Sequence, residues 1–189
     1  MIFASFPWKK EMERLLKSLK KWSSKPTSER AEFYIQRAVF LSAFILRKLM
    51  ENRKVTDAVR DQSIRCKAYS AFRSVSDRVS TFSGLADVSD DYDLANPEDI
   101  TLSCFDLMSE IMHSYVFRIV IDEETNSMVS FLVNSYNRRD SRLLEIDLQR
   151  FESVLTDAIL DSVESMSISV HPTSGKIVAE VRGRAERRK

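Results

Sequence analysis

Glycine is scarce in this chain, with only Gly84, Gly175 and Gly183. Loops that cradle phosphates need glycines at fixed spacing, because the backbone must approach the ligand closely and adopt positive φ angles. Neither G-x-x-x-x-G-K-[ST] nor G-x-G-x-x-G occurs, and the nucleophile elbow G-x-S-x-G is also missing. The sequence therefore gives no support to a loop-based nucleotide enzyme or to an α/β-hydrolase.

Cysteine and long apolar runs are scarce as well. Cys66 and Cys104 lack metal-type spacing, and no pattern of a leader peptide or membrane span is present, so we expect free thiols in a cytoplasmic protein. The most apolar run, AVFLSAFIL at residues 38–46, is far shorter than the about 20 residues that a membrane crossing needs. It is expected to lie in a buried core helix.

Helical patterns dominate the first part of the chain. Apolar residues at helical spacing predict an amphipathic helix over residues 8–22, with six lysines or arginines on its other positions. A second helix is expected over residues 28–53, because Glu29 and Glu32 suit the positive end of its dipole. The apolar stripe of the first helix requires cover from the core or from a partner.

Strand patterns follow, beginning with the alternation at residues 63–70. After a polar loop that ends near residue 99, Thr101 is expected to cap a helix over 102–114, with Ile100 packing on Phe105. Further elements are then predicted in the order of strands at 114–122, 127–134 and 142–148, a helix at 149–163, and a hairpin of 167–171 with 176–182.

The predicted fold class is α+β, with N-terminal helices followed by an antiparallel β meander with flanking helices and a C-terminal hairpin. Residues 1–25 are expected to form a basic helix that packs on the core or on a partner. Residues 26–182 are expected to form one domain, and residues 183–189 a basic, disordered tail.

The segments RAVFLSAFILRKLME, EIMHSYVF and LLEIDLQRF resemble a family of small bacterial proteins of uncharacterised activity. The resemblance covers most of residues 38–151, and the matching positions are mainly core types. It implies a compact bacterial domain and no particular chemistry.

The first candidate site is the pair Glu110 and His113, which lie three residues apart on a predicted helix. Ferritin-like diiron helices present two ligands at this spacing, but such a site needs a second pair. The other histidine, His171, has no glutamate three residues before it. We therefore expect a structural role for Glu110 and His113, with no metal and no cofactor.

The second candidate site comes from the element order after residue 101, which is similar to the core of restriction-endonuclease-like nucleases. Those nucleases hold a divalent metal with an aspartate on one strand and an E-x-K motif on the next. Here Asp122 and Glu123 end the first strand, and the third strand has Glu145 and Asp147 in place of E-x-K. An active nuclease is the less favoured interpretation, and solvated strand ends are the alternative.

A third pattern is the acidic segment DVSDDYDLANPE, which begins at Asp87. Its acids and serine follow the ligand spacing of an EF-hand loop, with Glu98 in the twelfth position. Tyr92, however, occupies the sixth position, where the sharp turn requires glycine. We expect an ordinary acidic loop.

Charge is distributed unevenly along the chain. Residues 1–78 carry 18 lysines or arginines against 8 acids, whereas residues 79–117 carry 8 acids and no lysine or arginine. The candidate contacts for a polyanion are Lys9, Lys10, Lys17, Lys20, Lys21, Arg184, Arg187 and Arg188. The alternative is that the basic helices and the acidic segment neutralise each other within the fold or across a homo-oligomer.

Three functions are compatible with these patterns. The leading hypothesis is a non-catalytic interaction protein that binds a protein partner or itself, as a small subunit of a larger assembly. The second is a nucleic-acid-associated or nuclease-like protein that uses the basic N-terminal half. The third is a peripheral protein that lays residues 1–22 on an anionic membrane surface.

Overall fold

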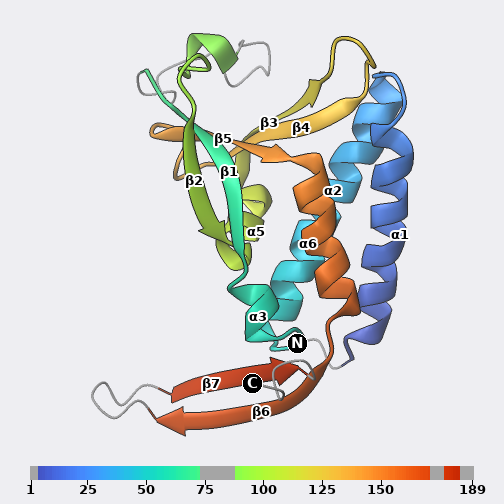
Figure 1. Ribbon diagram of the computed structural model, residues 1–189, viewed down its shortest axis with the longest axis vertical. Coiled ribbons are helices and arrows are strands. Elements are labelled where there is room, and N and C mark those ends of the chain that lie inside the picture. Colours follow the sequence, from blue (N-terminus) through green and yellow to red (C-terminus); the bar gives the residue numbers. More distant parts are fainter. Residues whose placement is uncertain (1–3, 73–87, 171–176, 184–189) are drawn as a thin grey trace.

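The computed structural model in Figure 1 describes residues 4–72, 88–170 and 177–183. It has helices, a five-stranded sheet and a separate two-stranded hairpin, so the α+β class and the order of its parts are confirmed. Within these ranges, no helix has the length and apolar character needed to cross a membrane.

Two long helices begin the fold. They are α1 (Phe6–Ser23) and α2 (Glu29–Glu51), and the Ser28 hydroxyl caps α2 by accepting a hydrogen bond from the Ala31 amide. The apolar stripe of α1 is buried and consists of Met12, Leu15, Leu16 and Leu19. It packs on α2 and on α6 (Leu148–Leu160), so the chain itself covers the stripe.

The five strands of the main sheet are β1 (Ser63–Ser70), β2 (Glu98–Ser103), β3 (Ser114–Ile121), β4 (Met128–Ser135) and β5 (Arg142–Asp147). Their order is β2-β1-β5-β4-β3, and every neighbouring pair is antiparallel. The predicted meander is therefore β3-β4-β5, and β1 joins it through β5. Two short helical elements, α3 (Asp57–Arg60) and η2 (Val88–Asp90), lie between these larger ones.

The structure corrects the predicted helix start at Thr101. Thr101 lies inside β2, opposite Arg65 of β1, and Ser103 caps α5 (Cys104–Met112) by accepting a hydrogen bond from the Asp106 amide over 3.1 Å. The reason is the alternation of partly buried Ile100 and Leu102 with exposed neighbours, which is typical of an edge strand. The helix is thus shorter than predicted, and its cap is two residues later.

The main core lies on one face of the sheet. Phe131 of β4 and Leu144 and Ile146 of β5 are fully buried between this face and helices α5, α6 and α2. The ring of Phe131 packs against Phe151 of α6 with a centroid distance of 5.4 Å. Close packing of this kind fixes the distance between sheet and helices.

The opposite face of the sheet is only partly covered. A small apolar cluster lies at one end of it and consists of Tyr69, Tyr92, Val116, Leu132 and Leu143. Tyr92 donates a hydrogen bond to the carbonyl oxygen of Arg139 over 2.7 Å and accepts one from Asn134 Nδ2 over 2.6 Å. The rest of this face carries polar side chains and forms a groove.

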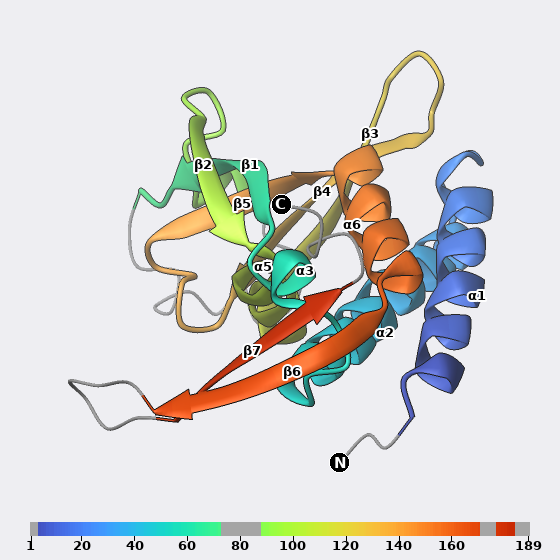
Figure 2. The same cartoon turned by 60° about the horizontal axis from the view of Figure 1, so that its bottom comes forward.

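The last element is the predicted hairpin, formed by β6 (Val163–Val170) and β7 (Ile177–Gly183). In Figures 1 and 2 it projects from the end of the molecule near α3 and points away from the main sheet. Gly183, the first residue of the expected basic tail, ends β7, and Arg184, Arg187 and Arg188 lie outside the described residues.

Candidate functional site

Glu110 and His113 are not brought together as a ligand pair. Glu110 is buried, and its carboxylate accepts a hydrogen bond from the Ser135 amide over 3.1 Å and lies 3.5 Å from a guanidinium nitrogen of Arg142. His113 is exposed at the C-cap of α5. Glu110 therefore ties α5 to β4 and β5, because both of its oxygens face those strands.

Asp122 and Glu123 lie in the turn that joins β3 to β4. Asp122 accepts hydrogen bonds from the backbone amide and the hydroxyl of Thr125, each over 2.8 Å, and these bonds lower its pKa. This is the geometry of an Asx turn. No group of three or more histidine, cysteine or acidic side chains suited to a metal occurs in the part of the chain that the structure describes.

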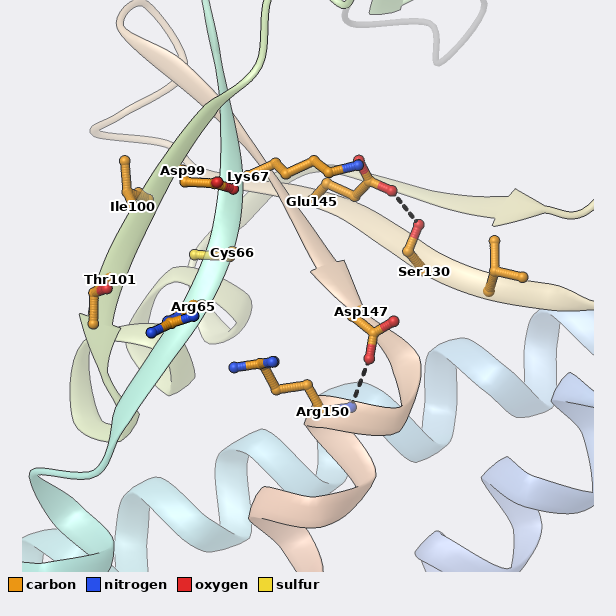
Figure 3. Close-up of a pocket in the computed structure, with 11 residues that line it drawn as sticks. Arg65, Cys66, Lys67, Asp99, Ile100, Thr101, Ser130, Glu145, Asp147 and Arg150 are labelled. Carbon is orange, nitrogen blue, oxygen red and sulfur yellow. Dashed lines mark hydrogen bonds and ion pairs between the residues drawn. The ribbon is translucent and has the colours of Figure 1, made fainter.

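Glu145 and Asp147, in contrast, share a groove on the exposed face of the sheet (Figure 3). The groove has a volume of about 710 Å³, and its floor is formed by β2, β1, β5 and β4. The two acids point to the same face because they lie two residues apart on one strand. Lys67 of β1 is the direct cross-strand neighbour of Glu145.

The Glu145 carboxylate is surrounded by donors. It accepts hydrogen bonds from the hydroxyl of Tyr69 and from Ser130 Oγ, the latter over 2.7 Å, and Lys67 Nζ lies 3.7 Å away. Burial raises the pKa of Glu145, but the bonds from Tyr69 and Ser130 and the charge of Lys67 outweigh it and leave the pKa lowered. Glu145 is thus held as an ionised carboxylate, and its lowered pKa makes it a weak general base.

Asp147 has a structural task as well. Its Oδ1 accepts a hydrogen bond from the Arg150 amide over 2.8 Å and caps the start of α6. With Glu145 occupied and Asp147 at a helix cap, the strand does not present the paired open carboxylates that a nuclease metal site requires. The arrangement gives the nuclease hypothesis no support.

Two arginines of this groove were not among the candidate site residues predicted from the sequence. Arg65 of β1 and Arg150 of α6 both line it, and Figure 3 shows the Arg150 side chain extending toward β1, where Arg65 lies. The alternation in SIRCKAYS placed Arg65 and Lys67 on the exposed face of a strand. No sequence signal connected them with Arg150, which reaches the groove only because α6 begins at the end of β5.

The candidate lysines of α1 are largely paired. Lys10 and Lys17 bind Glu13 over 3.0 and 2.8 Å, and these hydrogen bonds, first from Lys17 and then from Lys10, lower the pKa of Glu13 to about 2. Lys9 donates a hydrogen bond to the Asp161 carbonyl. The remaining two contacts are Lys20 with Glu152 over 3.7 Å and Lys21 over the ring of Trp22.

The acidic segment does not cover α1. In Figures 1 and 2, η2 and the residues after it lie on the opposite side of the main sheet from α1. Tyr92, at the sixth position of the EF-hand spacing, is buried in the small apolar cluster, and Asp87 lies outside the described residues. The segment meets the basic half at β1 and the residues after it, because Asp99 lies opposite Lys67 in the β1–β2 register and the backbones of Asp91 and Asp93 bond to Phe72 and Ser70.

The hairpin is a second candidate surface. All of β6 is exposed, and Met166, Ile168 and Val170 are 53%, 65% and 64% accessible on one of its faces. Among the described residues β6 pairs with β7 alone. An exposed apolar strand with an unpaired edge is a feature that soluble proteins usually avoid.

Comparisons with known proteins add no constraint on either surface. No protein-family model, no curated protein and no solved structure matches this chain.

Proposed function

We propose that this chain is a non-catalytic interaction protein that associates through its hairpin with a second copy of itself. The observation that carries the proposal is the outer edge of β6, which is exposed along its whole length. A strand edge presents unpaired N–H and C=O groups in a row, and another strand satisfies them directly.

At Met166 and Ile168, the backbone N–H and C=O groups of β6 point toward the strand edge that β7 does not occupy. On the far side of the hairpin, the Val181 amide donates a hydrogen bond to Asp57 over 2.8 Å, and the Ala179 carbonyl accepts one from Arg53 over 2.9 Å. Val181 and Ala179 therefore direct these groups away from β6. Their cross-strand partners Met166 and Ile168 direct theirs away from β7 in the same way.

From Ser165 onward, the edge of β6 lacks the usual protection. Natural edge strands carry lysine, proline or inward-pointing charges that block further pairing, and residues 165–170, with the sequence SMSISV, contain none of these. Two copies can therefore meet antiparallel without repulsion between like charges. Such pairing places serine opposite serine on one face and apolar side chains opposite each other on the other face.

The base of the hairpin is held in a fixed position. The Asp161 carboxylate accepts hydrogen bonds from the amide and the hydroxyl of Thr56, over 2.9 and 2.8 Å. At Gly183 an added Cβ would lie 3.1 Å from the Ser162 carbonyl oxygen, so the chain packs closely there. A firmly seated hairpin presents its edge in one orientation, which reduces the entropic cost of association.

The length of β6 sets the strength of the association. A strand of eight residues is about 26 Å long at roughly 3.3 Å per residue, and edge pairing alone buries less than the roughly 1,200 Å² of a standard interface. We therefore expect a dimer with a dissociation constant in the micromolar range, about 1 to 100 µM.

The other functions have less support. The apolar stripe of α1 is buried in the core, which removes the surface that a membrane would bind, and the lysines of α1 have acidic or aromatic neighbours. A cytoplasmic location is part of the proposal. Its support is that Cys66 and Cys104 are free and buried, and that burial raises their pKa values to about 11 and about 12.

The experiment that tests the proposal is sedimentation velocity over a concentration series of the full chain. We expect concentration-dependent dimerisation in the parent, and loss of the dimer in Ile168→Lys, because the lysine places like charges on the paired strands. The matched control is Ile121→Lys, which introduces the same change at an exposed position of β3 and leaves the dimer intact. A parent that stays monomeric up to about 1 mM, or a dimer unaffected by Ile168→Lys, contradicts the proposal.

A further inference from the structure

The groove on the sheet face is lined by two arginines, Arg65 and Arg150. Among the residues that the structure describes, the guanidinium groups of Arg65 and Arg150 make no hydrogen bond and no ion pair, although both line the same groove. Figure 3 shows the Arg150 side chain extending from the first turn of α6 toward β1, where Arg65 lies. Two like charges that line one groove repel each other, and an anion bound between them removes this repulsion.

The surroundings of the two arginines suit an anion at their end of the groove. Thr101 of β2 stands opposite Arg65 in the strand register, and its hydroxyl supplies a further donor beside the guanidinium. The nearest acid on the α6 side, Asp147, already accepts a hydrogen bond from the Arg150 amide. Guanidinium groups bind phosphate oxygens through two parallel N–H bonds, so a pair of arginines favours a phosphate.

The other end of the groove has the opposite character. Asp99 and Glu145 lie there on either side of Lys67, as Figure 3 shows. Carboxylates accept hydrogen bonds from hydroxyl and amino groups, and they repel additional phosphates. The groove is therefore matched to a ligand with one anionic end and one donor-rich end, and a polynucleotide fits it poorly.

We propose that the groove is a binding site for a small organic phosphate that carries hydroxyl or amino groups. The phosphate lies between Arg65 and Arg150, and the donor groups face Asp99 and Glu145. The volume of about 710 Å³ is in the range of about 300 to 1,000 Å³ that is usual for small-molecule sites. This site is separate from the hairpin and does not depend on self-association.

The test is a titration of the full chain, followed by backbone amide NMR, with inorganic phosphate and then with glycerol 3-phosphate. At constant ionic strength, inorganic phosphate should shift the amides of Arg65, Thr101 and Arg150 in a saturable way. Glycerol 3-phosphate should bind more tightly, because its hydroxyls reach the acidic end. Asp99→Asn should reduce that difference.

Variants separate a built site from general attraction of anions. Arg65→Gln and Arg150→Gln should each weaken phosphate binding about tenfold, since each removes a charge-assisted hydrogen bond. The control is Arg37→Gln, an exposed arginine on α2, which should leave binding unchanged. Because all three side chains are exposed, the variants should keep the parent's melting temperature.

Several results would overturn this site. One is the absence of saturable shifts, and another is binding that survives in both arginine variants. Equal shifts with chloride at the same concentration would indicate an adventitious ion only. Tighter binding of a single-stranded oligonucleotide than of glycerol 3-phosphate, lost in the same two variants, would assign the groove to a polyanion.

Discussion

The hydroxyl of Tyr69 donates a hydrogen bond to the carboxylate of Glu145 across the pairing of β1 with β5. The two residues are diagonal neighbours on the polar face of the sheet, at the point where the small apolar cluster meets the groove. Burial and the neighbouring Glu145 raise the pKa of Tyr69, whereas the pKa of Glu145 is lowered. Tyr69 is therefore a hydrogen-bond donor at any physiological pH.

This contact predicts a specific pH dependence of stability. A carboxylate with a lowered pKa stabilises the fold fully above its unfolded value of about 4.3, and this stabilisation is lost as the pH falls through the folded pKa. In Glu145→Gln the unfolding free energy should therefore change less between about pH 5 and about pH 3 than in the parent. Urea denaturation at a series of pH values measures this. Parallel curves for parent and variant would show that Glu145 is not held as an ion.

Removal of the Tyr92 hydroxyl should be costly. Tyr92 is 1% exposed, and Tyr92→Phe leaves the Arg139 carbonyl and one Asn134 amide hydrogen without this partner. We expect a loss of about 1 to 3 kcal/mol in the free energy of unfolding, measured by chemical denaturation. Tyr136→Phe is the control, because Tyr136 is 58% exposed and water replaces its bonds. Similar effects in both variants would contradict the prediction.

Because the apolar face of α1 is buried, a cavity made in that face should destabilise the fold. Leu19 is fully buried, so Leu19→Ala should cost about 2 to 5 kcal/mol of unfolding free energy. Phe6→Ala, at an exposed position of the same helix, should cost less than about 1 kcal/mol.

The burial of α1 also predicts that the parent protein remains in the supernatant when mixed with anionic liposomes. Co-sedimentation would mean that α1 leaves the core on lipid.

The seating of the hairpin can be tested at Asp57. Asp57→Ala removes the acceptor of the Val181 amide, so hydrogen exchange at that amide should accelerate, while exchange at amides between β6 and β7 changes little. Dimerisation should weaken, because the hairpin then samples more orientations. The exposed Asp61 offers a control in Asp61→Ala. Unchanged exchange at Val181 would show that Asp57 does not hold the strand.

The ion pairs that Glu13 forms within α1 predict how removal of its charge changes DNA binding. Glu13→Gln releases Lys10 and Lys17 together, and should raise nonspecific DNA binding at low salt with a steep salt dependence. Glu32→Gln, the same change at an exposed position of α2, is the control. Asp93→Asn should have no such effect, because its segment lies across the sheet from α1. Fluorescence anisotropy with labelled DNA distinguishes these outcomes, and a rise in Asp93→Asn would contradict them.

The regular parts of this fold were predictable from local patterns. Strand β1 coincides with the alternation at residues 63–70, and α1 and α2 lie within two residues of their predicted bounds. The hairpin was predicted, but β6 begins at Val163, four residues before the predicted strand and inside the predicted helix, whereas α6 ends at Leu160. The edge strand β2 was missed, because it has only two partly buried apolar residues, Ile100 and Leu102, and Thr101 is a typical helix cap. Local pattern does not reveal that β1 is available to pair with it.

The groove was predictable only in pieces. Glu145 and Asp147 were candidates because they alternate on one strand, but their donors Tyr69 and Ser130 come from two other strands. Arg150 lines the groove only because α6 begins directly after β5. These neighbours depend on the strand order and register, which propensity and spacing do not specify.

The position of β1 beside β5 also has a consequence for how the chain folds. The meander β3-β4-β5 and α6 are contiguous in sequence, so their contacts close short loops, whereas the pairing of β1 with β5 closes a long one. We expect the meander to form first and β1 to join it late. During synthesis α1 and α2 can pack on each other as soon as both have been made, whereas α6, which also covers α1, follows β5. The rest of their apolar surface thus stays uncovered until β5 and α6 have been made, and this interval is when the nascent chain is most exposed to aggregation and most in need of a chaperone.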